Sequence, residues 1–100
     1  MPHATASVNG ITVAETDTYE LVDGNVYFPP AALKTSHFTP STTTTYCPYK
    51  GTASYFTVTT GKTEVADAAW SYAEPKTGFE RIEGWVAFYG GRGDVEVKKE

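Results

Sequence analysis

Turn signals recur along this chain at intervals too short to leave room for long helices. Asn9-Gly10 separates two short β-favouring runs, and this dipeptide readily supplies the positive φ angles of a two-residue type I′ hairpin. Further turn signals are Asp23-Gly24, Gly61, Glu83-Gly84 and Gly90-Gly91-Arg92-Gly93. This spacing predicts a mostly β protein built from antiparallel strands.

The segments between the turns have the residue types of strands. Residues 55–60 are β-branched or aromatic throughout, and residues 94–98 alternate between polar and apolar side chains. In residues 85–89 the side chains that would point to either face of a strand are apolar, which predicts a central strand covered on both faces. One short helix is expected over residues 30–34, because a proline is tolerated in the first helical turn.

Residues 66–73 are ambiguous between helix and strand. Their alanine content favours a helix. Their alternation favours a strand that places Ala66, Ala68, Trp70 and Tyr72 on one face. From these residues alone the strand is only slightly preferred.

Length and composition predict one soluble domain over residues 1–100, with frayed ends that include residues 98–100. The chain has 8 Lys and Arg against 12 Asp and Glu, a net charge of −4, which argues against binding to nucleic acid or to an acidic membrane surface. No apolar window is long enough for a membrane span, and residues 1–5 lack the basic and apolar regions of a signal peptide. We therefore expect a cytoplasmic protein, and no feature favours a particular oligomeric state.

Cysteine and histidine are too scarce for a structural metal site. Cys47 is the only cysteine, which excludes an internal disulfide and fits a reducing compartment. His3 and His37 lie far apart in the sequence, so the paired spacing of zinc ligands is absent. We expect a domain without a metal or a cofactor.

The densest group of reactive side chains lies around Cys47, in the run Thr-Tyr-Cys-Pro-Tyr-Lys-Gly. Lys50, three residues after Cys47, would favour the thiolate and make Cys47 a nucleophile. The alternative is a small buried cysteine beside a structural or solvated lysine. Because a working nucleophile needs an activating neighbour and no histidine is fixed nearby, we favour this alternative.

A second group contains Trp70, Tyr72 and Glu74. Two residues apart on a strand, Trp70 and Tyr72 would face the same side, and aromatic rings with a nearby carboxylate can hold a small ring or a cation. Two aromatic residues are more often part of a core. Glu74 would either orient a ligand or form an ion pair with Lys50 or Arg81.

Taken together, these runs resemble a known family. Their order and spacing are similar to those of the domain of unknown function family 427, in the runs Tyr27-Phe28-Pro29, 45–55, 67–75 and 84–89. The resemblance covers about residues 8–97. Tyr46 stands where this family often has histidine, and Ala73 where it often has proline. The first departure removes one partner for Cys47 and further lowers the case for catalysis.

The resemblance implies a β-tent fold, in which two small antiparallel sheets meet at an angle with aromatic side chains between them. It also implies that residues 66–72 form a strand. Similar tents in the ligand-binding domain of cereblon and in methionine sulfoxide reductase B usually bind zinc through cysteines, a site that the single cysteine here excludes. Some family members carry a nucleotidyltransferase label, but this chain lacks a Gly-Ser and paired Asp motif for metal-bound nucleotide.

Three hypotheses for function follow. The first is a small-molecule-binding domain, with Trp70 and Tyr72 as pocket walls, Lys50 and Glu74 as polar anchors, and Cys47 at the floor or rim. The second is a small enzyme that uses Cys47 or a Lys50–Glu74 pair. The third is a protein-interaction module with exposed aromatic anchors. A pocket closed by rings favours the first, a perturbed Cys or Lys pKa the second, and a flat aromatic patch the third.

Overall fold

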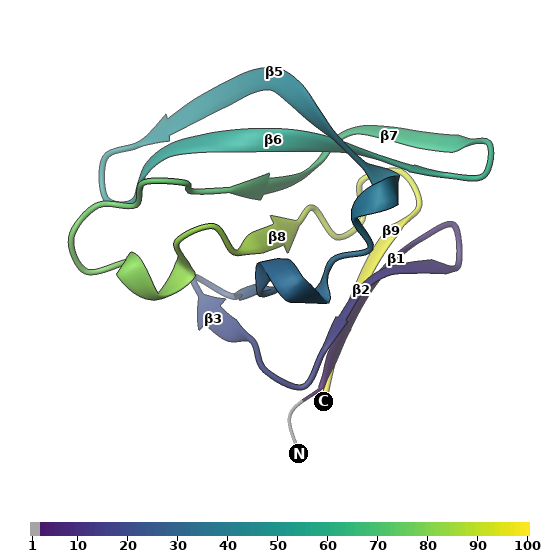
Figure 1. The fold of residues 1–100 in the computed structure, drawn as a ribbon, viewed down its shortest axis with the longest axis horizontal. Helices are drawn as coiled ribbons and strands as arrows, with labels where there is room; N and C mark the ends of the chain where they lie inside the picture. Colours follow the sequence, from purple (N-terminus) through teal and green to yellow (C-terminus); the bar gives the residue numbers. More distant parts are fainter. Residues whose placement is uncertain (1–2) are drawn as a thin grey trace.

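The computed structural model describes residues 3–100 as β-strands joined by turns and short 3-10 helices (Figure 1). Met1 and Pro2, which belong to the N-terminal segment considered above, lie outside the described residues. The strands are β1 (Ala4–Val8), β2 (Ile11–Thr16), β3 (Glu20–Val22), β4 (Asn25–Tyr27), β5 (Phe38–Cys47), β6 (Gly51–Thr60), β7 (Thr63–Ser71), β8 (Val86–Phe88) and β9 (Val95–Lys99). The 3-10 helices are η1 (Pro30–Ala32), η2 (Thr35–His37) and η3 (Glu80–Ile82). The predicted mostly β class is confirmed.

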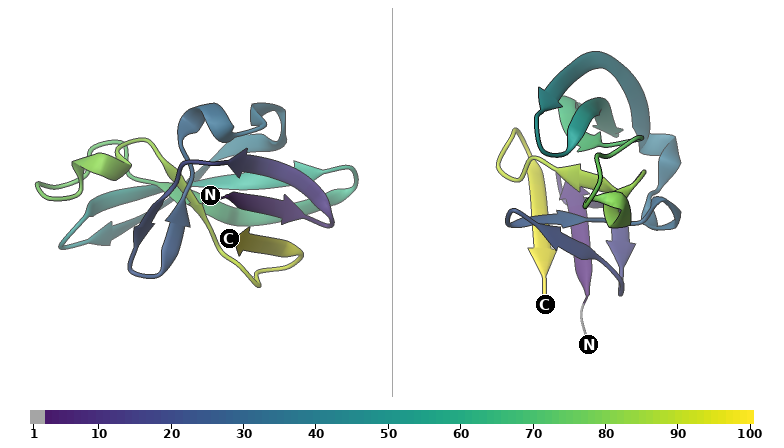
Figure 2. Two further views of the ribbon diagram at one scale, coloured as in Figure 1. Left: turned by 90° about the horizontal axis from the view of Figure 1, so that it is seen from below. Right: turned by 90° about the vertical axis from the view of Figure 1, so that its left-hand side faces the viewer.

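The strands form three antiparallel sheets instead of the expected two. Their strand orders are β2-β1-β9, β3-β4 and β5-β6-β7-β8. The three-stranded sheet stands at an angle to the four-stranded sheet (Figures 1 and 2). The hairpin β3–β4 forms a ladder of its own, and a single bridge between Phe28 and Val86 joins the end of this hairpin to β8.

Two hairpin turns have the backbone geometry that their dipeptides predict. Asn9 and Gly10 have φ angles of 51° and 78°, and Asp23 and Gly24 have φ angles of 52° and 80°. Positive φ at both central residues is the mark of a type I′ turn, which Asn-Gly and Asp-Gly favour. The turn at Asp23 sets the position of a carboxylate that becomes important below.

The expected short helix over residues 30–34 is only the single 3-10 turn η1, and no α-helix occurs within residues 3–100. The reason is that the chain leaves the turn to pair with β2. Leu33 is already extended, with φ −84° and ψ 137°, and bridges to Ala14. The backbone N–H of Lys34 then donates to Val13 at 2.8 Å.

The ambiguous alanine-rich segment is a strand, as the resemblance implies, but its alternation is interrupted. Asp67 has a φ of 52°, and the register between β6 and β7 shifts between Phe56 and Val58. This irregularity is a β-bulge in which residues 66–68 of β7 lie opposite Thr57 alone, two residues more than regular pairing allows. As a result Ala68 packs in a different apolar cluster from Trp70, and the single face expected for these residues is not continuous.

Apolar side chains cover both faces of the four-stranded sheet. One cluster includes Phe28, Val58 and Phe88 and packs against β1, and the other includes Tyr27, Trp70 and Ile82. All three residues of β8 are buried, as its composition predicts. However, β8 ends its sheet instead of lying in the middle, and the bridge to Phe28 covers its outer edge.

The C-terminal residues are paired, whereas the sequence favours a frayed end. Strand β9 extends to Lys99, and the N–H of Glu100 donates to the carbonyl of His3 at 2.8 Å. Within residues 3–100, no helix has the length and hydropathy that a membrane crossing requires.

Candidate functional site

The candidate site is built on one row of side chains that crosses three strands. Tyr55 on β6 pairs with Trp70 on β7, and Trp70 pairs with Ala87 on β8. Directly opposed residues of antiparallel strands point to the same face. Tyr72 and Tyr89 follow Trp70 and Ala87 by two positions, and these aromatic residues join the same cluster. The sheet therefore presents several aromatic rings on one face.

These rings surround a cavity of about 330 Å³, which we call the aromatic pocket. Its lining consists of Asn25, Tyr27, Lys50, Tyr55, Trp70, Tyr72, Phe88, Tyr89 and Gly90. Tyr27 packs edge-on against Trp70 with ring centroids 6.3 Å apart, and the rings of Trp70 and Tyr89 lie 4.5 Å apart. The volume falls at the small end of the range of ligand sites, about 300–1,000 Å³.

Four tyrosine hydroxyls line this pocket, and three of them have protein partners. The Tyr55 and Tyr89 hydroxyls are 3.2 Å apart, and Tyr55 is also 3.0 Å from the Thr45 hydroxyl. The hydroxyl of Tyr27 accepts a hydrogen bond from Nε1 of Trp70 at 3.2 Å. Because the Tyr27 oxygen is an acceptor in this bond, its own proton remains available for a second partner.

The fourth hydroxyl, that of Tyr72, has no hydrogen-bond partner among residues 3–100, although this residue is only 7% exposed. Burial raises the pKa of Tyr72 to about 12, so the phenol stays protonated at neutral pH. Among the described residues no fully buried side-chain nitrogen or oxygen lacks a partner, so this hydroxyl is open to the solvent-accessible space of the pocket. Tyr72 thus presents an unused O–H donor at the pocket wall.

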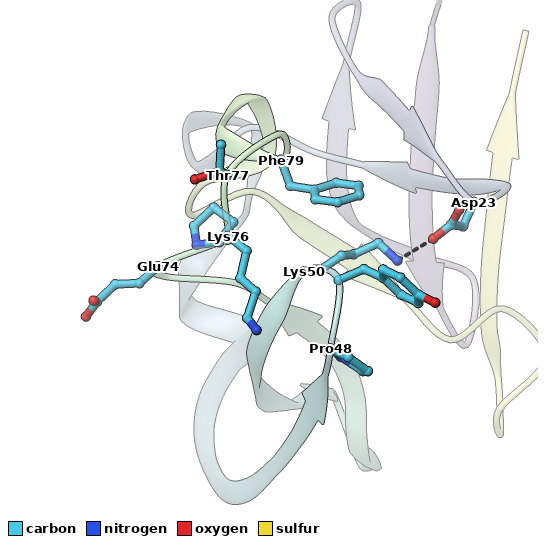
Figure 3. A pocket seen from close by; sticks show the side chains of 9 residues that line it. Asp23, Pro48, Lys50, Glu74, Lys76, Thr77 and Phe79 are labelled. Carbon is cyan, nitrogen blue, oxygen red and sulfur yellow. Dashed lines mark hydrogen bonds and ion pairs between the residues drawn. The ribbon is translucent and has the colours of Figure 1, made fainter.

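Lys50 supplies the positive charge of the site. It lies in the turn between β5 and β6, and its side chain is 12% exposed. Its ammonium forms an ion pair with the carboxylate of Asp23, whose side chain is 67% exposed, and lies 5.6 Å from the centre of the Phe79 ring (Figure 3). The hydrogen bond to Asp23 raises the pKa of Lys50, and burial opposes this shift.

Lys50 also lines a second, larger cavity of about 870 Å³, which we call the open groove. The groove is lined by Asp23, Pro48, Tyr49, Lys50, Glu74, Pro75, Lys76, Thr77 and Phe79 (Figure 3). The carboxylate of Glu74 points away from Lys50 in this view. No ion pair joins Lys50 to Glu74, and Arg81 pairs with Glu20 at 2.9 Å. The expected Lys50–Glu74 pair is therefore replaced by the pair of Lys50 with Asp23.

Cys47 is half-buried at the end of β5 and packs against the aromatic cluster. The backbone N–H groups of Lys50 and Tyr49 lower the pKa of Cys47, burial opposes them, and the charge of Lys50 adds a smaller lowering. A second segment braces the turn that holds these residues, because the N–H of Lys76 donates to the carbonyl of Lys50 at 2.8 Å. Within residues 3–100, no three His, Cys, Asp or Glu side chains come together as a metal site.

A model of a protein family matches residues 2–99, and its description is "Domain of unknown function (DUF427)". The chain belongs to this family. The resemblance seen in the sequence is confirmed and extends over almost the whole chain. A comparison with curated proteins gives no match. Since the description of the family names no activity, the function of this DUF427 domain has to be argued from its site.

Of the five residues singled out from the sequence, the DUF427 domain brings Lys50, Trp70 and Tyr72 to the aromatic pocket. Cys47 lies beside the aromatic cluster, and Glu74 lines the open groove. Among the described residues, Lys50 alone lines both cavities.

Sequence reasoning missed Asp23 and three tyrosines of the pocket. In the sequence, Asp23 has a sufficient explanation as the first residue of the Asp23-Gly24 turn, so it does not stand out as a site residue. The tyrosines carry a signal that could have found them: each has a phenylalanine as its neighbour, in the pairs Tyr27-Phe28, Tyr55-Phe56 and Phe88-Tyr89. Neighbours on a strand point to opposite faces, so each phenylalanine joins one cluster and each tyrosine the other.

Two single-atom changes separate the roles of the tyrosine hydroxyls. Tyr72→Phe should leave the free energy of unfolding within about 0.5 kcal/mol of the parent, because its hydroxyl has no hydrogen-bond partner among residues 3–100 and is open to solvent. Tyr27→Phe should lower it by about 1–3 kcal/mol, because the buried Nε1 of Trp70 loses its acceptor. Urea unfolding followed by circular dichroism measures both. Equal losses in the two variants would contradict this assignment.

Proposed function

We propose that this DUF427 domain binds a small molecule in the aromatic pocket, with Trp70 and Tyr72 as walls and Lys50 as a charged anchor. The observation that carries the proposal is the hydroxyl of Tyr72, an O–H donor at the wall of the pocket that has no hydrogen-bond partner among residues 3–100. A ligand acceptor could replace solvent at this hydroxyl without rearranging the wall, because the pocket is already formed.

The neighbouring residues extend the proposed site. A ligand that reaches past Lys50 enters the open groove, where Glu74 would contact its far end. Cys47 would lie at the rim, beside the aromatic cluster. The single cysteine and the net charge of −4 support binding in a reducing, cytoplasmic setting, without metal, nucleic acid or membrane as partners.

Native mass spectrometry of the protein purified from its own source tests the proposal. The expected result is a mass excess from a co-purified small molecule, which is lost on denaturation. A fragment library should then change the fluorescence of Trp70 in a Trp85→Phe background, where Trp70 is the only tryptophan. Adding Trp70→Phe should weaken binding, which a tryptophan-independent method such as calorimetry would follow in that double variant.

The control rests on the fact that Lys50 lines both the aromatic pocket and the open groove. Glu74→Gln should weaken only fragments long enough to reach the open groove, since Glu74 lines the groove and not the pocket. The absence of any co-purified molecule, together with unchanged Trp70 fluorescence throughout the library, would contradict the proposal.

A further inference from the structure

We infer that the ligand of the aromatic pocket carries an anionic oxygen group, such as a carboxylate, which replaces Asp23 as the partner of Lys50. This inference rests on the proposed function and names the chemistry of its ligand. It follows from the polar groups of the pocket wall, from the unequal burial of the Lys50–Asp23 pair and from the charges around the rings.

The wall offers a ligand several hydrogen-bond donors, beside the side-chain amide of Asn25, which can both donate and accept. Lys50 has an ammonium, which can only donate. The hydroxyl of Tyr72 has no partner among residues 3–100, and the hydroxyl of Tyr27 has already used an oxygen lone pair for Trp70. Burial raises the pKa of both tyrosines, so both keep their protons at neutral pH. Two phenols and an ammonium suit a group that accepts several hydrogen bonds at once.

The ion pair of Lys50 is built so that its partner can be exchanged. The ammonium belongs to a side chain that is 12% exposed, whereas the carboxylate belongs to one that is 67% exposed. Little of the Lys50 side chain is exposed, but its bond to Asp23 lies at the surface. An exposed carboxylate holds the ammonium only weakly, because water competes for Asp23. An anion inside the pocket would meet Lys50 from its buried side.

The charges around the rings argue against a cationic ligand, which aromatic cages otherwise favour. None of the described residues that line the aromatic pocket carries a carboxylate. Lys50 is part of its wall, and the guanidinium of Arg92 already lies 4.2 Å from the centre of the Tyr89 ring. A cation among these rings would therefore lie close to the positive charges of Lys50 and Arg92, the first of which is partly offset by Asp23.

Three probes of one shape and different charge test the inference: benzoate, benzamide and benzylammonium. They are titrated at low ionic strength into the Trp85→Phe protein, and the indole N–H of Trp70 is followed by nuclear magnetic resonance. Benzoate should shift this signal and bind at least about tenfold more tightly than benzylammonium, a difference typical of a close charge contact. Lys50→Gln should remove the preference for benzoate.

The decisive variant is Asp23→Asn, because asparagine is as well suited as aspartate to this turn, where φ is 52°. Removing the competing carboxylate should tighten benzoate binding by about two- to fivefold, the strength of an exposed ion pair. Glu64→Gln, which removes the same charge at the exposed start of β7, is the matched control and should leave the affinity unchanged.

The outcomes separate this inference from the proposed function. Tighter binding of benzamide or benzylammonium than of benzoate, or weaker benzoate binding in Asp23→Asn, would overturn the anionic ligand and leave a small-molecule site. If none of the three probes shifts the Trp70 signal and the purified protein carries no small molecule, both the inference and the proposed function are wrong.

Discussion

Phe28→Ala is expected to lower the free energy of unfolding by about 3–5 kcal/mol, the usual cost of removing a buried phenylalanine ring. Phe28 is completely buried and packs edge-on against Phe88, with ring centroids 5.5 Å apart. Its backbone exchanges two hydrogen bonds with Val86, at 2.8 and 2.9 Å. The truncation would leave a void where the β3–β4 hairpin meets β8. A domain with an ordinary free energy of unfolding, about 5–15 kcal/mol, would lose a large part of it.

Urea unfolding of Phe28→Ala measures this loss, and Leu21→Ala is its control. Leu21 lies on the same hairpin and is 48% exposed, so its truncation should cost less than about 0.5 kcal/mol. Similar losses for the two variants would show that the hairpin is not held through Phe28.

Gly51→Ala is the second large effect, with an expected loss of about 2–3 kcal/mol in the free energy of unfolding and weaker ligand binding. Gly51 has a φ of 111°, a conformation that side chains disfavour, and an added Cβ would lie 3.3 Å from the backbone oxygen of Glu74. Relief of this contact would move the turn that carries Lys50. The substitution therefore affects the fold and the site together.

Gly61→Ala provides the comparison for Gly51→Ala. Gly61 also has a positive φ, of 55°, but a Cβ there has no atom within 4 Å. Its replacement should cost only the conformational penalty, about 1–2 kcal/mol, and should leave binding intact. Chemical unfolding and benzoate titration of both variants check the difference, and equal effects on binding would exclude a role for the Gly51 contact.

Local sequence signals predicted the strands because their physics is local. Asn9-Gly10 and Asp23-Gly24 determine their turns through backbone conformation alone. The alternation and β-branching of residues 55–60 predict a strand whatever it pairs with. The prediction of a short helix over residues 30–34 is wrong for the opposite reason. The backbone of Leu33 and Lys34 pairs with β2, a strand distant in the sequence.

The candidate site was only partly predictable because its contacts join distant segments. Trp70 lies on β7 and Tyr72 directly follows the end of that strand, so their two-residue spacing alone brings both to the aromatic pocket. The partner of Lys50 depends on where the β3–β4 hairpin lies, and nothing near Lys50 in the sequence indicates Asp23. Glu74 is closer in sequence and has the right charge, but its side chain turns away (Figure 3).

The alternation of tyrosine and phenylalanine has a consequence for selectivity. Tyr55 cannot shift outward without moving Phe56, and Tyr27 cannot shift without moving Phe28, since each pair shares one stretch of backbone and the phenylalanines pack in the opposite cluster. Close-packed interiors resist such displacement. We therefore expect the ring walls of the proposed site to keep their positions on binding. Molecules too wide for the space between the rings should be excluded, whereas longer ones could extend past Lys50 into the open groove.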